Sequence, residues 1–395
     1  MASGIYTRQW FIYSKKILLL LLVLIFLLNS PGAYSGPGLA AEYELGLHII
    51  NADQQTQENL YSQYLPVILK SPLPAAPPPT PITFGIYPQS WPGTDGMIEA
   101  HAIDAWAGKR SSIIGTFSAI EEPGIDANVR GQLTTIWNNG YTPYVNIGTD
   151  YTTNQVANGH LDSYLREWAK ALKTFSNGGE RMAFLAPFPE MNLVGPYGLD
   201  PAGFKAAYWH IQSVFHNEGV PDESLRWVFV PNGWSDPQYN FEYFYPGDAT
   251  VDVVGFSAYN WGCNPKLPNA NKIWTGEYKT FKKYLQRMTA MAPTKPIFIS
   301  QTGTTAWYCD LKANPPIAPY IDDAKKNDWL FESYAYLATY PGLRAVLYFN
   351  MYKASEDFDW PFWISSTSHY DGFKIGVSNS AYGYIPPESM KNVIP

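Results

Sequence analysis

The chain has 395 residues, a formal net charge of −7 and 15% charged residues. A negative charge with no long basic run argues against nucleic acid or an anionic membrane as a partner. Aromatic residues make up 16% of the chain, with 14 Trp and 29 Tyr. Flat aromatic rings pack well against the C–H faces of sugar rings. The composition therefore favours a carbohydrate ligand, although a large core also accommodates many aromatic side chains.

Residues 1–35 have the features of a secretory signal peptide. Basic residues precede an apolar run at 17–28, and Ala33-x-Ser35 offers a small-residue cleavage site. A spanning helix needs about 20 apolar residues, so a cleaved signal is favoured over an uncleaved anchor. We therefore expect a protein that is secreted or held at the cell surface, with no membrane contact beyond the signal peptide.

The segment after the signal peptide divides into two parts. Residues 36–70 are mixed in polarity and predict no defined structure, whereas residues 71–82 are dense in proline. Such density favours an extended polyproline II linker and excludes a helix. The folded domain is therefore expected to cover residues 83–395.

Eight short apolar runs alternate with amphipathic stretches in this domain. The predicted strands are Thr83–Tyr87, Ser112–Phe117, Thr142–Ile147, Ala183–Pro187, Arg226–Pro231, Val251–Phe256, Pro296–Ser300 and Ala345–Phe349. Helical spacing is found at 95–107, 161–175, 202–218, 277–291 and 322–339. Apolar strands that are each followed by a helix indicate a parallel sheet buried on both sides. A doubly wound sheet would give the same alternation, but no glycine-rich phosphate motif follows an early strand. We therefore predict an α/β fold, a (β/α)8 TIM barrel.

Glu190 comes shortly after the fourth predicted strand, and Gln301 comes directly after the seventh. In an α/β barrel these strand ends meet on the open face that carries the chemistry. Two carboxylates at such a place hydrolyse glycosides, because one protonates the leaving oxygen while the other attacks or activates water. Here one of the two residues is an amide.

Four stretches carry a resemblance to a known family. They are Pro187-x-x-Glu190-Met-Asn192, Trp227-x-x-x-Pro231-Asn232-Gly233, the segment Tyr245–Tyr259, and Lys295-Pro296-x-x-x-Ser-Gln301-Thr-Gly303. With them the chain resembles the retaining barrel glycosidases, most closely the β-mannanase family, glycoside hydrolase family 26. The resemblance implies that Glu190 is the acid/base and that Gln301 stands where the family has its nucleophilic glutamate. It also implies a polysaccharide or oligosaccharide as partner, such as a β-mannan.

Three positions depart from the family pattern. Ala186 replaces the usual arginine, and Pro189 replaces the histidine directly before the acid. The Gln301 amide is a poor nucleophile and does not form the glycosyl ester of a retaining mechanism. Together these differences predict an altered mechanism or a loss of catalysis.

Polar and aromatic side chains after the strands are the expected substrate-binding residues. They are Asn192, Asn232, Trp234, Tyr259, Trp261, Trp307 and Trp360, with Trp91 and Asn260 as further candidates. The spare carboxylates are Asp236, Asp252, Asp310, Glu356, Asp357 and Asp359. One of these at about 6.5 to 9.5 Å from Glu190 would permit an inverting mechanism. Asp252 starts its strand, so a structural role is expected for it.

Cys263 and Cys309 are the two cysteines of the chain. In an exported protein such a pair predicts a disulfide, and the alternative of a catalytic thiol is disfavoured because no histidine lies near either residue in sequence. The six histidines show no metal-ligand spacing. We expect no metal, no cofactor and a monomer.

Three hypotheses for the function remain open. The protein is an active glycosidase of altered mechanism, a carbohydrate-binding protein that has lost catalysis, or a surface scaffold whose barrel holds no ligand.

Overall fold

The computed structural model describes residues 80–89, 94–265, 273–352 and 359–394. The predicted signal peptide, residues 36–70 and nearly all of the proline-rich linker lie outside these residues, as do Trp91, Glu356 and Asp357. Within the described ranges, no helix is long and apolar enough to cross a membrane.

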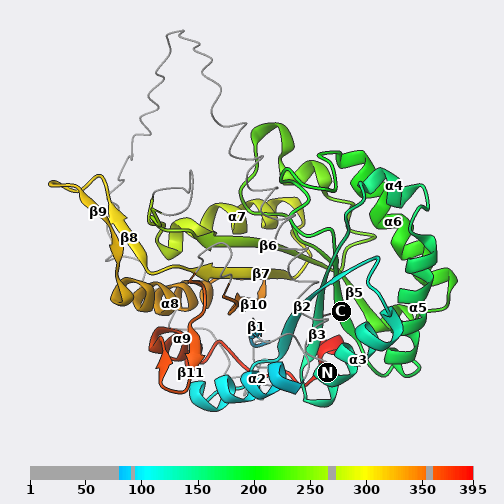
Figure 1. The fold of residues 1–395 in the computed structure, drawn as a ribbon, viewed down its shortest axis with the longest axis horizontal. Helices are drawn as coiled ribbons and strands as arrows, with labels where there is room; N and C mark the ends of the chain where they lie inside the picture. Colours follow the sequence, from blue (N-terminus) through cyan, green and yellow to red (C-terminus); the bar gives the residue numbers. More distant parts are fainter. Residues whose placement is uncertain (1–79, 90–93, 266–272, 353–358, 395) are drawn as a thin grey trace, which may run out of the picture. The chain divides into compact units, whose positions relative to one another are not determined.

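Eight parallel strands close into a barrel in the order β1-β10-β7-β6-β5-β4-β3-β2 (Figure 1). They are β1 (Thr83–Tyr87), β2 (Ile113–Ala119), β3 (Thr142–Gly148), β4 (Ala183–Pro187), β5 (Leu225–Phe229), β6 (Val253–Asn260), β7 (Ile297–Thr304) and β10 (Leu343–Phe349). Every predicted strand overlaps one of them, with shifts at the ends. The prediction of a (β/α)8 barrel is confirmed.

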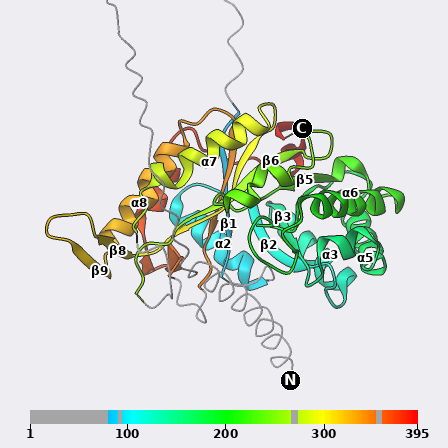
Figure 2. The ribbon, with the colours of Figure 1, turned by 90° about the horizontal axis from the view of Figure 1, so that it is seen from above.

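Helices surround the barrel. They are α2 (Thr94–Ala107), α3 (Ile125–Asn138), α4 (Thr153–Ala157), α5 (Asp162–Ser176), α6 (Pro201–Asn217), α7 (Glu277–Met291), α8 (Asp323–Leu337), α9 (Asp371–Val377) and α10 (Pro387–Val393). Helices α3, α5 and α6 lie on one side, and α7 and α8 on the other (Figure 2). Helix α5 buries Leu165, Trp168 and Leu172, whose spacing places them on one face against the strands.

The C-terminal segment closes one end of the barrel. Ile385, Met390 and Ile394 belong to the same buried cluster as the side chains inside the barrel. The backbone N–H of Ile385 donates to Ser112 Oγ at 2.8 Å, and Arg226 Nε donates to the Ile394 carbonyl at 2.9 Å. Ser112 and Arg226 stand at the starts of β2 and β5, so this segment covers the N-terminal strand ends. The C-terminal ends form the opposite mouth.

A hairpin that the sequence did not predict follows β7 at this mouth. Strands β8 (Trp307–Asp310) and β9 (Ile317–Ile321) pair antiparallel and extend away from the barrel beside α8 (Figures 1 and 2). A second small hairpin, β11 (Trp363–Ser365) with β12 (Ser368–His369), precedes α9.

A disulfide attaches the base of the first hairpin to the loop after β6. Cys263 and Cys309 are bonded, with their Cα atoms 5.9 Å apart. The expected pairing is thus confirmed, and the alternative of a free catalytic thiol is wrong. Gly262 beside the bond has φ +56°, and a Cβ added there would lie 2.2 Å from the Trp307 carbonyl oxygen. Only glycine fits this close approach of loop and hairpin.

Candidate active site

A β-bulge in β7 sets the direction of Gln301. Ile299 is in register with Phe256 of β6, but the next β6 residue, Ser257, pairs with Gln301. The same region of β7 also shifts against β10. An extra residue in one strand re-aims the side chains that follow. Gly255 makes room for the bulge, because a Cβ at that position would lie 2.2 Å from Ser300 Oγ.

The side chain of Gln301 is buried in a network of neutral groups. It is 6% exposed. Its Oε1 accepts a hydrogen bond from Tyr259 Oη at 3.0 Å, and its Nε2 donates to Asn146 Oδ1 at 3.3 Å. Asn146 Nδ2 in turn donates to Tyr87 Oη at 2.9 Å and to the Thr116 carbonyl at 3.2 Å. Tyr87 completes the chain by donating to the Ser300 carbonyl at 3.0 Å.

This network fixes the orientation of both amides. The Thr116 carbonyl only accepts, so the nitrogen of Asn146 must face it and the oxygen of Asn146 must face Gln301. Position 301 therefore needs a donor toward Asn146 and an acceptor toward Tyr259. An amide meets both demands, whereas an ionised carboxylate would set two acceptors against each other.

Glu190 is held in an unusual backbone conformation at the end of β4. Its φ is +60°, and Phe188 two residues earlier has φ +53°. Residues with side chains rarely adopt this left-handed region, and such strain concentrates at functional sites. Two backbone hydrogen bonds of 2.8 Å hold the segment, from Phe188 to the Ile147 carbonyl and from Glu190 to the Val230 carbonyl.

The carboxylate of Glu190 is half-buried and anchored through one oxygen. Oε1 accepts hydrogen bonds from Asn232 Nδ2 at 2.9 Å and from Ser257 Oγ. Among the described residues, no group donates to Oε2. One oxygen is therefore fixed while the other is available to a ligand.

Tyr259 and Ser257 connect Glu190 with Gln301. Ser257 donates to Glu190 and pairs with Gln301 across the two strands. Burial, with the nearby charge of Glu190, raises the pKa of Tyr259 well above its usual range. Tyr259 is thus a neutral donor to Gln301. The two residues singled out from the sequence share one site at the mouth.

An aromatic cluster lies beside this pair. The Tyr259 ring is 5.1 Å from Trp360 and 5.7 Å from Trp261, and those two indoles are 5.2 Å apart. Tyr259 also contacts Phe349 at 6.3 Å. We call Tyr259, Trp261 and Trp360 the aromatic wall.

The expected substrate-binding residues divide into two groups. Trp234 is 44% exposed, and Asn232, Tyr259, Trp261 and Trp307 are half-buried. These positions remain accessible to a ligand.

The residues of the other group are buried and make their contacts within the protein. Asn192 is 1% exposed, and its amide nitrogen donates to Ser235 Oγ and to the carbonyls of Asn232 and Trp234. Trp360 is 2% exposed and is the most buried member of the aromatic wall, since Tyr259 and Trp261 are half-buried. Asn260 is fully buried, and its oxygen accepts from Gly262 and Thr275. The sequence showed that these residues follow strands, but not which way they turn.

The spare carboxylates within the described residues have structural partners. Asp252 accepts from the backbone N–H of Trp227 at 2.7 Å, in line with its expected structural role. Asp236 caps a 3-10 turn, Pro237–Tyr239, and Asp310 accepts from the backbone of Lys312 and Ala313. Asp359 accepts from Thr305 and Ala306 just after β7. None of the four bonds to Glu190 or Gln301.

Within the same described ranges, no group of three or more His, Cys, Asp or Glu residues has an arrangement that would hold a metal ion.

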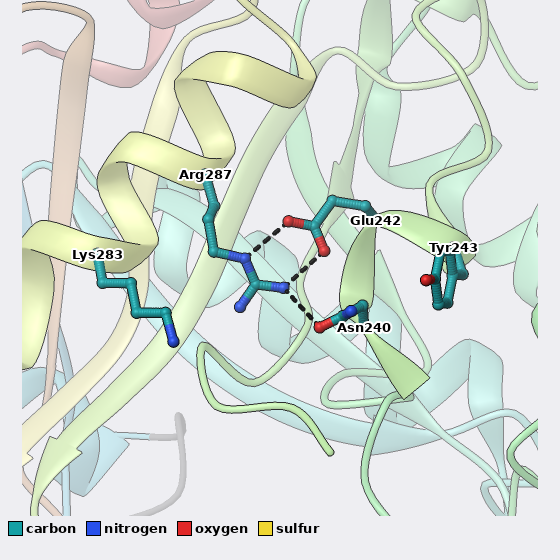
Figure 3. A pocket seen from close by; sticks show the side chains of 5 residues that line it. All are labelled: Asn240, Glu242, Tyr243, Lys283 and Arg287. Atoms are coloured by element: carbon teal, nitrogen blue, oxygen red, sulfur yellow. Dashed lines mark hydrogen bonds and ion pairs between the residues drawn. The ribbon is translucent and has the colours of Figure 1, made fainter. Parts of the chain in front are cut away.

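A polar hollow lies elsewhere on the surface, between α7 and the 3-10 turn Phe241–Phe244 (Figure 3). Its volume is about 320 Å³, and it is lined by Asn240, Glu242, Tyr243, Lys283 and Arg287. Arg287 binds both oxygens of Glu242, at 2.7 and 2.6 Å. Although burial opposes it, this guanidinium helps hold the pKa of Glu242 below its usual range. The hollow shares no residue with the Glu190 site.

Comparisons with known proteins agree with this architecture. No model of a known protein family matches the chain. Endoglucanase H of Acetivibrio thermocellus is 24% identical in an alignment of 293 residues that covers 64% of this chain and 28% of that protein. The chain thus spans less than a third of the length of this curated relative.

Two solved structures are similar in fold. The catalytic domain of a family 26 endo-β-1,4-mannanase from a Bacillus species has a TM-score of 0.55 and 16% identity, over 80% of this chain and 90% of that one. A family 26 β-mannanase from Bacteroides ovatus has a TM-score of 0.55 and 14% identity, over 80% and 93%. The chain therefore has a glycoside hydrolase-like barrel similar to those of family 26 mannanases.

Proposed function

We propose that the protein binds a β-linked polysaccharide such as a mannan at the C-terminal mouth, and that Glu190 acts there as a general acid/base. The reaction forms no covalent adduct at Gln301. The observation that carries this proposal is the strained, hydrogen-bonded placement of Glu190. A left-handed conformation costs on the order of 1 kcal/mol at a residue with a side chain, so it persists where the surroundings demand it.

The site suits a neutral sugar. Glu190 Oε2 offers an acceptor, and the half-buried rings of Tyr259 and Trp261 offer apolar faces. The disulfide and the N-terminal sequence support export of the chain, so we place this function outside the cell or at its surface. Residues 71–82 then serve as a spacer before the domain that begins near residue 83.

The test is hydrolysis of a panel of β-glycans, followed by detection of new reducing ends. Wild-type protein is expected to release them, and Glu190→Gln is expected to lose this release. Glu167→Gln, at an exposed position on α5, is the matched control and should behave as wild type. Release by Glu190→Gln at the wild-type rate would contradict the role of Glu190. The anomeric form of the first product distinguishes attack by water from attack by a group of the substrate.

A second candidate is binding without cleavage. It is favoured by the neutral network around Gln301, in which both the oxygen and the nitrogen of the amide already have a partner within the protein. Affinity electrophoresis in gels containing the same glycans distinguishes the two. Retardation without release of reducing ends supports a binding protein, and absence of both supports a scaffold without a glycan ligand.

A further inference from the structure

Lys326 is a buried cation close to the candidate active site. It lies in the first turn of α8 and is 1% exposed. Lysine is almost never buried to this degree without a partner, because removing its charge from water is costly. Lys326 therefore needs an account in terms of the groups around it.

The ammonium group is bonded to the segment that leads into the aromatic wall. Lys326 Nζ donates to the backbone carbonyl of Asp359 and lies 3.8 Å from Asp359 Oδ2. It also lies 4.6 Å from the centre of the Tyr370 ring. Asp359 itself accepts from Thr305 Oγ1 and, at 2.7 Å, from the backbone N–H of Ala306. This pair thus joins α8, the residues after β7 and the segment at Asp359.

Trp360 follows Asp359 directly. Its carbonyl accepts from Tyr348 Oη at 2.9 Å, and its ring contacts Tyr259 and Trp261 at 5.1 and 5.2 Å. Tyr259 donates to Gln301. A continuous series of contacts therefore leads from the buried lysine to the residue that replaces the nucleophile.

We propose that Lys326 is a positioning residue whose charge pair with Asp359 fixes Trp360 behind Tyr259 and Trp261, and so sets the shape of the aromatic wall. The effect on glycan binding rests on the proposed function. The effect on the wall itself does not.

Burial of the Lys326 charge opposes folding, and the negative charge of Asp359 offsets part of this cost. Burial lowers the pKa of Lys326 to about 8, although the negative charges of Asp359 and Asp323 favour the charged form of the lysine. Asp323 also accepts from Tyr370 Oη at 2.6 Å. The unfolded chain binds more protons than the folded protein between about pH 8 and pH 10.5, so the contribution of Lys326 to stability rises with pH there. Over the same interval the charge that holds Asp359 is lost. The wall should therefore loosen while the global fold gains stability, which a merely structural lysine would not produce.

The experiment compares wild type with Lys326→Met, which keeps the volume and removes the charge, and with Asp359→Asn, which keeps most of the shape. Lys325→Met is the matched control, because Lys325 is the exposed neighbour on the same helix. Near-ultraviolet circular dichroism is followed from about pH 6.5 to pH 9.5, and the Trp360→Phe spectrum is subtracted to isolate the signal of the wall.

We expect the wild-type and Lys325→Met signals to change with a midpoint near pH 8, and Lys326→Met and Asp359→Asn to lack that transition. At neutral pH, Lys326→Met should bind glycan about five-fold more weakly and have a lower melting temperature, because the Asp359 carbonyl and carboxylate lose their partner. A transition that persists in Lys326→Met, or a lower melting temperature with an unaltered wall signal, would overturn the proposal. If wild type binds no glycan, the proposed function fails, and the dichroism still decides the role of Lys326.

Discussion

Replacement of Gln301 by glutamate tests whether the site is built around an amide. The substitution exchanges the Nε2 donor, 3.3 Å from Asn146 Oδ1, for an oxygen. Asn146 cannot rotate its amide to compensate, because its nitrogen would leave the Thr116 carbonyl at 3.2 Å. At this buried position an ionised carboxylate would face an acceptor without a compensating cation.

The cost follows from the geometry. Leaving one buried acceptor unpaired costs about 1 to 3 kcal/mol. Burial should raise the pKa of the introduced carboxyl, since its protonated form restores the donor toward Asn146. A shift of about two units corresponds to about 2.7 kcal/mol. The folded state then binds more protons than the unfolded chain, so stability is lost as pH rises above the unfolded value of about 4.3.

Urea unfolding of wild type and Gln301→Glu from about pH 4 to pH 7.5 measures this difference. The two proteins should be nearly equal in stability at the acid end, and the variant should be about 2 to 3 kcal/mol less stable at neutral pH. Gln286→Glu, at an exposed position on α7, adds the same charge and should show little change. We expect no gain in glycan hydrolysis at about pH 4, where the introduced carboxyl is protonated and is a poor nucleophile. Equal stability of Gln301→Glu and wild type at all pH values would refute the reasoning, as would strong new hydrolysis at that acid pH.

Three further predictions concern the parts that support the site. The Cys263–Cys309 disulfide joins residues 46 positions apart in the sequence. Its reduction should lower the free energy of unfolding by up to about 4 kcal/mol, measured by urea unfolding with and without reductant. An unchanged urea midpoint would show that other contacts restrain the loop. Asn192→Ala should cost about 2 to 3 kcal/mol and weaken glycan binding, because Asn192 holds the loop that carries Asn232; normal binding by a destabilised variant would contradict this role. Glu242→Gln should have a melting temperature that falls less steeply with decreasing pH than that of wild type. A carboxyl with a lowered pKa stabilises the fold above its unfolded pKa and loses this effect as pH falls. An unchanged dependence of melting temperature on pH would argue against the contribution of Arg287.

The barrel was predictable because its strands are short apolar runs separated by amphipathic helices. The period of α5 is clear, since several bulky residues lie on one face. Helix α3 was missed because it buries only a narrow row, Ile125, Val129, Leu133 and Ile136, among polar residues. The β8–β9 hairpin was missed because β9 is largely exposed and lacks the alternation of a half-buried strand.

At the site, the sequence identified residue types but not directions. It placed Glu190 and Gln301 at strand ends and predicted the disulfide. It did not show that the side chains of Asn192 and Asn260 are buried and form hydrogen bonds with nearby loops. Nor did it indicate Asn146 and Tyr87, since a lone polar or aromatic residue in an apolar strand carries no signal for a partner so distant along the chain.

The bulge in β7 makes strand register as decisive as residue type. Successive side chains of a regular strand point to opposite faces, so in a β7 without the bulge Ser300 would pair with Ser257 and Gln301 would point to the opposite face. A change of register would thus exchange the residue at this position without any amino-acid substitution. Alignments of related barrels that ignore the register shift between Phe256 and Ser257 would compare side chains from opposite faces.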